Sequence, residues 1–240
     1  MMKDILATLQ RGFNWTWPSA LDFRDYRAEK REGFCGREWL SEAVRRWALD
    51  PDAPTVLLLQ GAAGVGKTAF LAHLLDGGGA GLPLAAQHFC LQGEAATLRP
   101  ELFVRSLAAQ LAEALPAYRQ SLRDPHLNDG VTERRRQLDG AISDPLTALE
   151  VAVLEPLAAL QPAPGPQLLV VDDLEAAQQA WPSGGEEPSA TLLALLIHLS
   201  GRLPRWLKLL ATCRGPIDGL MPPHQGLSPL VLAVAGDRNR

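Results

Sequence analysis

Gly61-Ala-Ala-Gly-Val-Gly-Lys-Thr68 has the G-x-x-x-x-G-K-T spacing of a phosphate-binding loop, and this stretch decides the fold. Residues 55–60 before it are mostly apolar strand formers, and residues 69–75 after it carry apolar side chains at helical spacing. The glycines let backbone N–H groups approach a phosphate closely, and the helix N-terminus adds partial positive charge. A turn that merely joined a strand to a helix would not need the whole pattern, so we predict a phosphate site.

The chemistry predicted for this loop is nucleotide binding together with a magnesium ion. Lys67 should reach the β- and γ-phosphates, and Thr68 should hold Mg²⁺ through its hydroxyl. The loop residues expected to bind the nucleotide are Gly61, Ala62, Ala63, Gly64, Val65, Gly66, Lys67, Thr68 and Ala69.

Length and composition are those of a globular protein. The 240 residues fit one α/β domain, with a second small unit possible, and the apolar content of 47% is ordinary. The net charge of −4 provides no basic field that would point to nucleic acid. The one dense basic cluster, Arg134-Arg-Arg136, is predicted to be a solvated helix face.

The cysteines and the apolar runs indicate where the protein works. Cys35, Cys90 and Cys213 are too scattered for a disulfide framework or a metal site, which fits a reducing compartment. The N-terminus has no signal-peptide layout, and the apolar run at residues 192–199 is too short to span a bilayer. We therefore predict a soluble cytoplasmic protein with no membrane partner.

Apolar strands alternate with helices along the chain. Pro-rich breakers and turns separate them. After the first strand, the patterns predict further strands at residues 84–90, 167–171, 206–212 and 229–234, and helices at residues 100–115, 145–160 and 189–202. Such alternation favours a parallel sheet covered by helices on both faces. Trp15, Trp17 and Phe23, in the mixed first segment, are expected to pack onto this domain.

Acidic residues end one of the predicted strands. The apolar run at residues 168–171 closes on Asp172, the Walker B pattern, and ligands of such sheets bind at the carboxyl ends of strands. Asp172 should therefore lie near Thr68 and hold Mg²⁺ with it. Asp173, or alternatively Glu175, could accept a proton from the attacking water.

Residues in two other segments are candidates for the same site. Arg214 follows a predicted strand and could contact the γ-phosphate, since a guanidinium matches phosphate geometry; a surface arginine is the alternative. Gly36 and Arg37 lie upstream of the first core strand and could cover the adenine. His73 and His88 have apolar surroundings, so both are expected to be core or interface residues.

Several blocks together resemble a known class. Residues 34–40 (FCGREWL), the phosphate-binding loop, residues 168–175 (LLVVDDLE) and residues 203–214 (LPRWLKLLATCR) occur in this order. The set resembles the STAND-class signalling ATPases, close to NACHT modules. It is most similar to the NTPase module of TANC-type ankyrin-repeat scaffold proteins and of bacterial repeat-bearing ATPases. The resemblance covers about residues 23–234.

The resemblance implies a fold and a mode of action. The fold would be a three-layer α/β/α P-loop NTPase with a parallel five-stranded sheet of order 5-1-4-3-2. Asp172 and Arg214 would flank the γ-phosphate, and Gly36-Arg37 would lie near the adenine. Such proteins are nucleotide-controlled switches that ADP holds closed and ATP permits to assemble. The Asp172-Asp173 pair looks more like the plant-resistance and apoptosome branch than like NACHT members.

The domain boundaries follow from these blocks. We predict a lead segment at residues 1–30, the NTPase domain at 31–236 and a tail at 237–240. Neither a winged-helix lid nor a repeat sensor nor an effector follows the fifth strand, so we expect such parts on other domains or subunits, and homo-oligomers are possible.

The leading hypothesis is a module that binds ATP or ADP with Mg²⁺ and hydrolyses ATP slowly within a signalling switch. The catalytic candidates are Lys67, Asp173, Glu175 and Arg214. The alternative is a nucleotide-binding interaction scaffold with little or no turnover. A small-molecule kinase is a third possibility, but no residues for an acceptor site or a phosphate-covering lid can be named.

Overall fold

The computed structural model describes residues 17–77, 81–123, 129–161, 163–178, 191–215 and 227–231. Within these ranges the strands are β1 (Val56–Gln60), β2 (Leu84–Phe89), β3 (Gln167–Asp172), β4 (Leu207–Cys213) and β5 (Leu227–Val231). The α-helices are α2 (Arg24–Arg31), α3 (Glu38–Leu49), α4 (Lys67–Leu75), α5 (Ala95–Leu98), α6 (Pro100–Ala114), α7 (Pro116–Arg123), α8 (Asp129–Asp139), α9 (Pro145–Leu149), α10 (Glu155–Ala158) and α11 (Leu192–Ser200). Short 3₁₀ helices lie at Gly140–Ile142 and Ala176–Gln178, and a π-helix lies at Glu150–Leu154.

The strands form one parallel sheet of order β2-β3-β4-β1-β5. The predicted alternation of parallel strands with helices is thus confirmed. β1, β3 and β4 are apolar along almost their whole length, because both faces of a parallel sheet are covered. The expected strand at 229–234 begins earlier, at Leu227, and residues 232–234 lie outside the described ranges.

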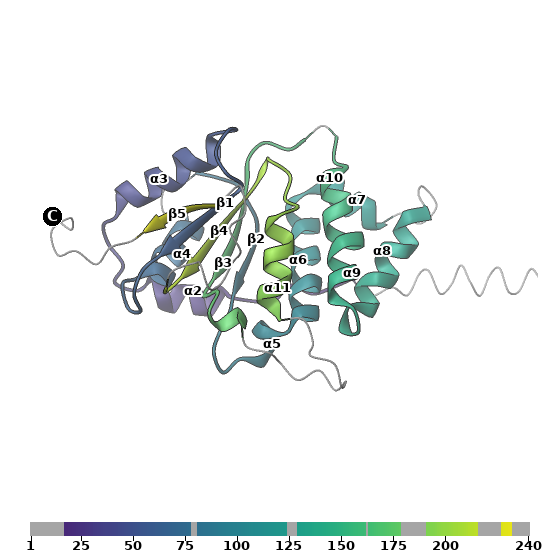
Figure 1. The fold of residues 1–240 in the computed structure, drawn as a ribbon, viewed down its shortest axis with the longest axis horizontal. Helices are drawn as coiled ribbons and strands as arrows, with labels where there is room; N and C mark the ends of the chain where they lie inside the picture. Colours follow the sequence, from purple (N-terminus) through teal and green to yellow (C-terminus); the bar gives the residue numbers. More distant parts are fainter. Residues whose placement is uncertain are drawn as a thin grey trace, which may run out of the picture.

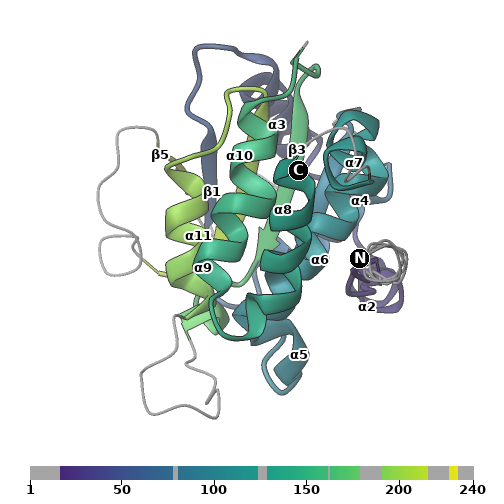
Figure 2. The same cartoon turned by 90° about the vertical axis from the view of Figure 1, so that its right-hand side faces the viewer.

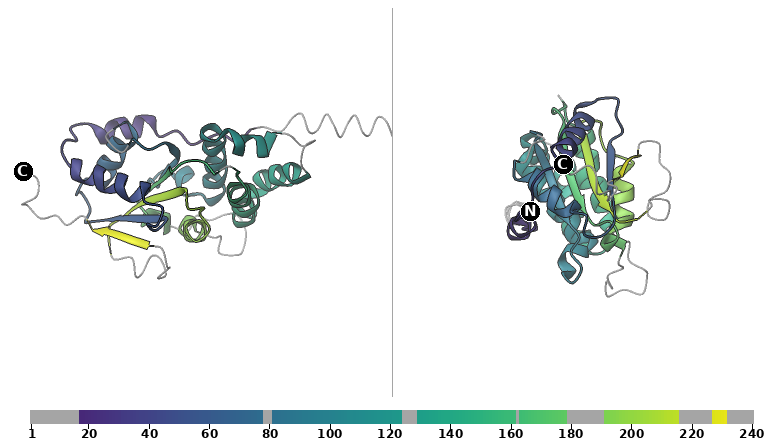
Figure 3. Two further views of the ribbon diagram at one scale, coloured as in Figure 1. Left: turned by 90° about the horizontal axis from the view of Figure 1, so that it is seen from above. Right: turned by 90° about the vertical axis from the view of Figure 1, so that its left-hand side faces the viewer.

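Helices cover the two faces of the sheet with separate apolar clusters. Alternate residues of β1 divide between them: Leu57 and Leu59 pack with α3 and α4, whereas Val56 and Leu58 pack with α6, α9 and α11. In Figure 1 the helices α6 to α11 gather at the right of the sheet, and Figure 2 shows that side from the front. Figure 3, seen from above, shows α2 and α3 away from these helices.

A side chain bonds to the backbone at the outer edge of β2. Gln110 on α6 accepts the backbone N–H of Gln87 at 2.9 Å and donates to the carbonyl oxygen of the same residue at 3.0 Å. At this one residue the amide therefore makes the two hydrogen bonds that a neighbouring strand would make. Occupied edge groups are not free to pair with another chain.

The helix predicted at residues 145–160 is interrupted. It consists of α9, the π-helix and α10, and the physical reason lies at Pro156, which has no N–H to donate to the carbonyl of Ala152. The fully buried Tyr118 hydroxyl donates to that oxygen at 2.7 Å. A tyrosine from α7 thus supplies the hydrogen bond that proline removes from the helix.

The predicted lead segment at residues 1–30 contains a helix. Residues 24–31 form α2, which packs against α4, and Phe23 just before it is buried. Trp17 packs against the larger apolar cluster, as predicted, whereas Trp15 lies outside the described residues. The rest of the predicted lead segment, residues 1–16, and the tail at 237–240 also fall outside them.

The basic cluster at residues 134–136 is on a helix, as predicted, but two of its side chains have structural partners. Arg134 and Arg135 donate from α8 to the carbonyls of Ser121 and Leu122 in the last turn of α7. Arg136 pairs with Glu133 in the same helix. Among the described residues, no helix is both long and apolar enough to cross a bilayer.

We predict that Tyr118→Phe lowers the free energy of unfolding by roughly 1–3 kcal/mol, because the carbonyl of Ala152 loses a buried donor. The matched control is Tyr26→Phe, at a tyrosine that is only partly buried, and it should stay within about 0.5 kcal/mol of wild type. Urea unfolding followed by circular dichroism measures both. Equal stability of the two variants would show that the tyrosine hydroxyl does not support the interrupted helix.

Candidate functional site

The predicted phosphate-binding loop connects β1 to α4, as the sequence requires. Gly64 and Gly66 have φ angles of +79° and +87°, which glycine adopts without strain. A Cβ on Gly66 would also come within 3.1 Å of the Arg37 guanidinium. At the start of the loop, the N–H of Gly61 donates to the carbonyl of Cys213 at 3.2 Å, so the loop begins hydrogen-bonded to the end of β4.

Lys67 is buried at the first position of α4. Its ammonium donates to the carbonyl oxygens of Gly61 and Ala62, at 2.5 and 3.0 Å. The loop therefore curls around its own lysine. This arrangement satisfies a charge that burial would otherwise penalise.

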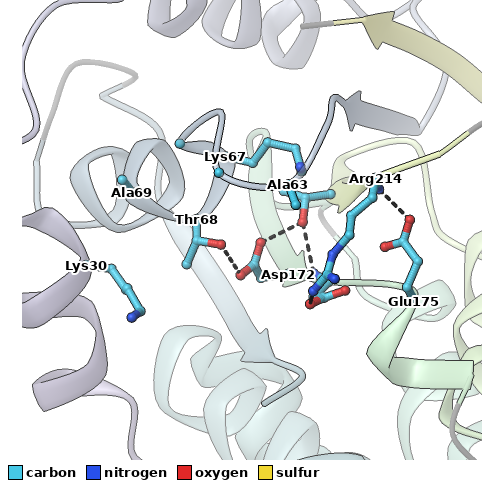
Figure 4. A pocket seen from close by; sticks show the side chains of 12 residues that line it. Lys30, Ala63, Lys67, Thr68, Ala69, Asp172, Glu175 and Arg214 are labelled. Atoms are coloured by element: carbon cyan, nitrogen blue, oxygen red, sulfur yellow. Dashed lines mark hydrogen bonds and ion pairs between the residues drawn. The ribbon is translucent and has the colours of Figure 1, made fainter. Parts of the chain in front are cut away.

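Asp172, at the end of β3, joins two other segments (Figure 4). Its carboxylate is almost fully buried and accepts the Thr68 hydroxyl at 2.8 Å and the Thr212 hydroxyl at 2.6 Å. Burial raises the pKa of Asp172, and the two hydroxyl donors oppose that shift. Thr68 and Asp172, predicted from separate motifs, are thus in direct contact.

Asp173 has an unusual backbone and several partners. Its φ angle is +59°, in the left-handed region, and its N–H donates to the Thr212 hydroxyl oxygen at 2.9 Å. Its carboxylate pairs with Arg214 at 2.6 Å and accepts the N–H of Ala176 at 3.3 Å. The hydrogen bond to the Asp173 carboxylate, and the charge of that carboxylate, raise the pKa of the Arg214 guanidinium above its ordinary value.

Glu175 holds the backbone of the same strand end. Its Oε1 accepts the N–H of Arg214 and, at 3.1 Å, that of Gly215. Its Oε2 is buried and has no hydrogen-bond partner among the described residues. Both candidate bases are therefore engaged with the segment that carries Arg214.

Gly36 and Arg37 form a left-handed turn before α3, with φ angles of +76° and +67°. The Arg37 guanidinium donates to the carbonyls of Val65 and Gly66 and lies over the Phe34 ring, 5.8 Å from its centroid. Positive φ at a non-glycine residue costs roughly 1–2 kcal/mol. The Arg37 side chain therefore contacts the backbone of the phosphate-binding loop.

The predicted site residues surround a pocket of about 330 Å³. Most of the sequence-predicted residues line it, but Gly61, Ala62, Val65, Gly36 and Arg37 do not. The lining consists of Lys30, Ala63, Gly64, Gly66, Lys67, Thr68, Ala69, Asp172, Asp173, Glu175, Thr212 and Arg214.

Two lining residues were not predicted from the sequence. Thr212 could have been found by register: Val171 pairs with Ala211, so the next residues of β3 and β4, Asp172 and Thr212, adjoin. Lys30 lies on α2, far upstream, and no spacing signal links it to the loop.

The remaining candidates of the sequence lie elsewhere. His88 is fully buried between the rings of Phe23 and Phe103, and burial lowers its pKa to about 4. His73 packs against Phe34, with ring centroids 4.9 Å apart. The described residues contain no group of three or more His, Cys, Asp or Glu side chains that could hold a metal ion.

A known protein family matches most of the chain. The family described as Nephrocystin 3, N-terminal, matches residues 35–214. The matched region runs from just before Gly36 to Arg214 and includes the phosphate-binding loop and the strand end at Asp172. Since this is well over half of the 240 residues, the chain belongs to the Nephrocystin 3, N-terminal family.

Proposed function

We propose that this chain is a Mg²⁺-dependent module that binds ATP or ADP, hydrolyses ATP slowly and works as part of a nucleotide-controlled switch. The observation that carries the proposal is the 2.8 Å contact between Thr68 and Asp172, which come from elements 104 residues apart. This contact lies in a pocket that is also lined by the glycine-rich loop and Lys67. A loop that could bind phosphates and two oxygen atoms that could bind a cation therefore line the same pocket.

The residues present fit a magnesium ion. Mg²⁺ prefers oxygen ligands and is usually held by one or two protein side chains together with substrate phosphates. The oxygens of Thr68 and Asp172 supply such a set, and the raised pKa of Asp172 indicates a buried carboxylate that a cation would stabilise. The ion would neutralise phosphate charge there.

Both carboxylates that could activate water are engaged, which supports slow turnover. Asp173 pairs with Arg214, and Glu175 accepts two backbone N–H groups. Before Asp173 could act as base, Arg214 would have to leave it. A γ-phosphate is a suitable competing partner for a guanidinium, so nucleotide binding itself could release the base.

The strand order supports the finer assignment to the P-loop NTPase fold. Read from β5, the observed order is 5-1-4-3-2, which is the order implied by the resemblance to STAND-class ATPases. From the same resemblance to STAND-class ATPases, we propose that Gly36 and Arg37 lie near the adenine. By the same resemblance, we propose that a lid, a sensor and an effector act together with this module.

A scaffold that binds nucleotide without turning it over is the second candidate. It is favoured by the same observation that suggests slow hydrolysis, because the pair with Arg214 at 2.6 Å keeps the Asp173 carboxylate from acting as a base. Phosphate release by the wild-type protein under saturating Mg-ATP distinguishes the two: binding without turnover would favour the scaffold.

We predict that Lys67→Ala weakens Mg-ATP binding about tenfold to a hundredfold, since a charge-assisted contact is worth roughly 1.5–3 kcal/mol. The control is Arg24→Ala, which removes an exposed cation that pairs with Asp22 outside the pocket. Titration with a fluorescent ATP analogue measures both. Equal affinity in wild type and Lys67→Ala would contradict the nucleotide site.

We predict that Asp173→Asn does not weaken nucleotide binding and slows hydrolysis by roughly 10²-fold. Glu175→Gln is the matched control, because its amide oxygen could still accept the N–H groups of Arg214 and Gly215. Single-turnover hydrolysis of Mg-ATP measures both variants. If Glu175→Gln abolishes turnover and Asp173→Asn does not, the base is Glu175.

We predict that Asp172→Asn makes the nucleotide-free protein more stable at neutral pH while it weakens Mg²⁺-dependent binding. The folded-state pKa of Asp172 is raised, so the ionised carboxylate destabilises the fold above that pKa. As pH falls through it, Asp172 becomes protonated and neutral like asparagine, and the difference between the proteins should shrink.

Urea unfolding at neutral and acidic pH checks this result. A variant that is less stable than wild type at neutral pH would mean that the hydroxyls of Thr68 and Thr212 already outweigh the desolvation of the carboxylate.

A further inference from the structure

We propose that Lys30 binds the phosphate chain of the nucleotide from the wall of the pocket opposite Arg214, an inference that rests on the proposed function. Lys30 is on α2, upstream of residues 35–214 that the family matches. It nevertheless lines the same pocket as Thr68 and Asp172.

The helix that carries Lys30 is anchored. Phe23, just before α2, is buried and packs against Phe89 at a centroid distance of 5.3 Å. Arg27 and Arg31 both pair with Asp76 at the end of α4, at 3.3 and 3.5 Å. α2 is therefore attached to the helix that begins at the phosphate-binding loop.

Lys30 lies on the side of α2 that faces the pocket. Figure 4 shows it beyond Thr68 and Ala69, with Arg214 at the far side. Its ammonium is 5.2 Å from the centroid of the Tyr26 ring, one turn earlier on the helix. The lysine is thus in cation–π contact with this ring.

The negative charge of the site reaches α2. Burial, and then the carboxylates of Asp172 and Asp173, raise the pKa of the Tyr26 hydroxyl. These are the carboxylates at the centre of the proposed nucleotide site. The position of Lys30, next to Tyr26, is therefore within the field of the same charges.

Three cations line the pocket, and Lys30 is the one whose partner is most easily exchanged. Lys67 is held by loop carbonyls, and Arg214 is held by Asp173. Lys30 pairs at 2.8 Å with Glu29, the preceding residue, whose side chain is 68% exposed. Exposed pairs of this kind contribute only about 0–1 kcal/mol, so a phosphate oxygen could replace Glu29 at little cost.

The competing explanation is that Lys30 is a solvated lysine whose aliphatic stem covers Tyr26. In that case its charge would not matter for the ligand. A phosphate contact instead depends on the number of phosphates and on ionic strength, since a partly exposed charge pair is screened by salt.

The test compares Lys30→Ala with Arg24→Ala in titrations with Mg-ATP, Mg-ADP and AMP. Arg24 is on the same helix and has the same charge, but it is exposed and pairs with Asp22. We expect Lys30→Ala to lose roughly threefold to tenfold in ATP affinity and less in AMP affinity. Arg24→Ala should match wild type, and Lys30→Arg should restore binding.

The loss should also shrink when ionic strength rises from about 0.1 M to about 1 M, where the Debye length falls from about 10 Å to about 3 Å. If wild type binds nucleotide and Lys30→Ala binds equally well, the role of Lys30 is overturned while the proposed function stands. The same holds if Arg24→Ala loses as much affinity as Lys30→Ala. If wild type binds no nucleotide, the proposed function falls with it.

Discussion

A buried carboxylate, that of Asp172, is the constraint on which the rest of the site depends. A carboxylate away from water is tolerated only where donors or a cation replace its hydration. Here the donors are Thr68 at the start of α4 and Thr212 at the end of β4. The hydroxyls thus link the start of α4 to the ends of β3 and β4.

The charged groups around that carboxylate already have partners within the protein. Lys67 is bound by the loop carbonyls, and Arg214 by Asp173, whose own backbone is held in a left-handed conformation by Thr212. A phosphate would therefore exchange with existing contacts rather than fill a set of free ones. Binding by exchange couples the ligand to the conformation of the strand ends, which is what a switch needs.

The local parts of this arrangement could be predicted from the sequence, because their signals are local. The glycine pattern with its flanking strand and helix predicts the loop, and the apolar run that closes on Asp172 predicts the acid at the strand end. Thr212 required the register of β3 against β4, which a single strand does not reveal. Thr212 lies beside Asp172 only because β3 and β4 pair in this register.

Tertiary contacts explain the other differences. The sequence does not reveal that α2 and Lys30 belong to the site, because their partners, Asp76 and the pocket, lie far along the chain. The interrupted helix at residues 145–158 depends on Pro156 and on Tyr118 from another helix. Helical spacing alone predicts one continuous α-helix there, since the apolar residues keep their helical spacing through the π-helix.

The most direct test of the central claim is the thermal unfolding midpoint of the wild-type protein with Mg²⁺ alone, ADP alone, Mg-ADP and Mg-ATP. If Thr68 and Asp172 hold a cation whose coordination the phosphates complete, Mg²⁺ and nucleotide together should stabilise the folded protein far more than either does alone. At about a hundredfold excess over Kd the gain is about 2.7 kcal/mol, which corresponds to a rise of roughly 5–10 °C. An unchanged midpoint in all four conditions would contradict the account.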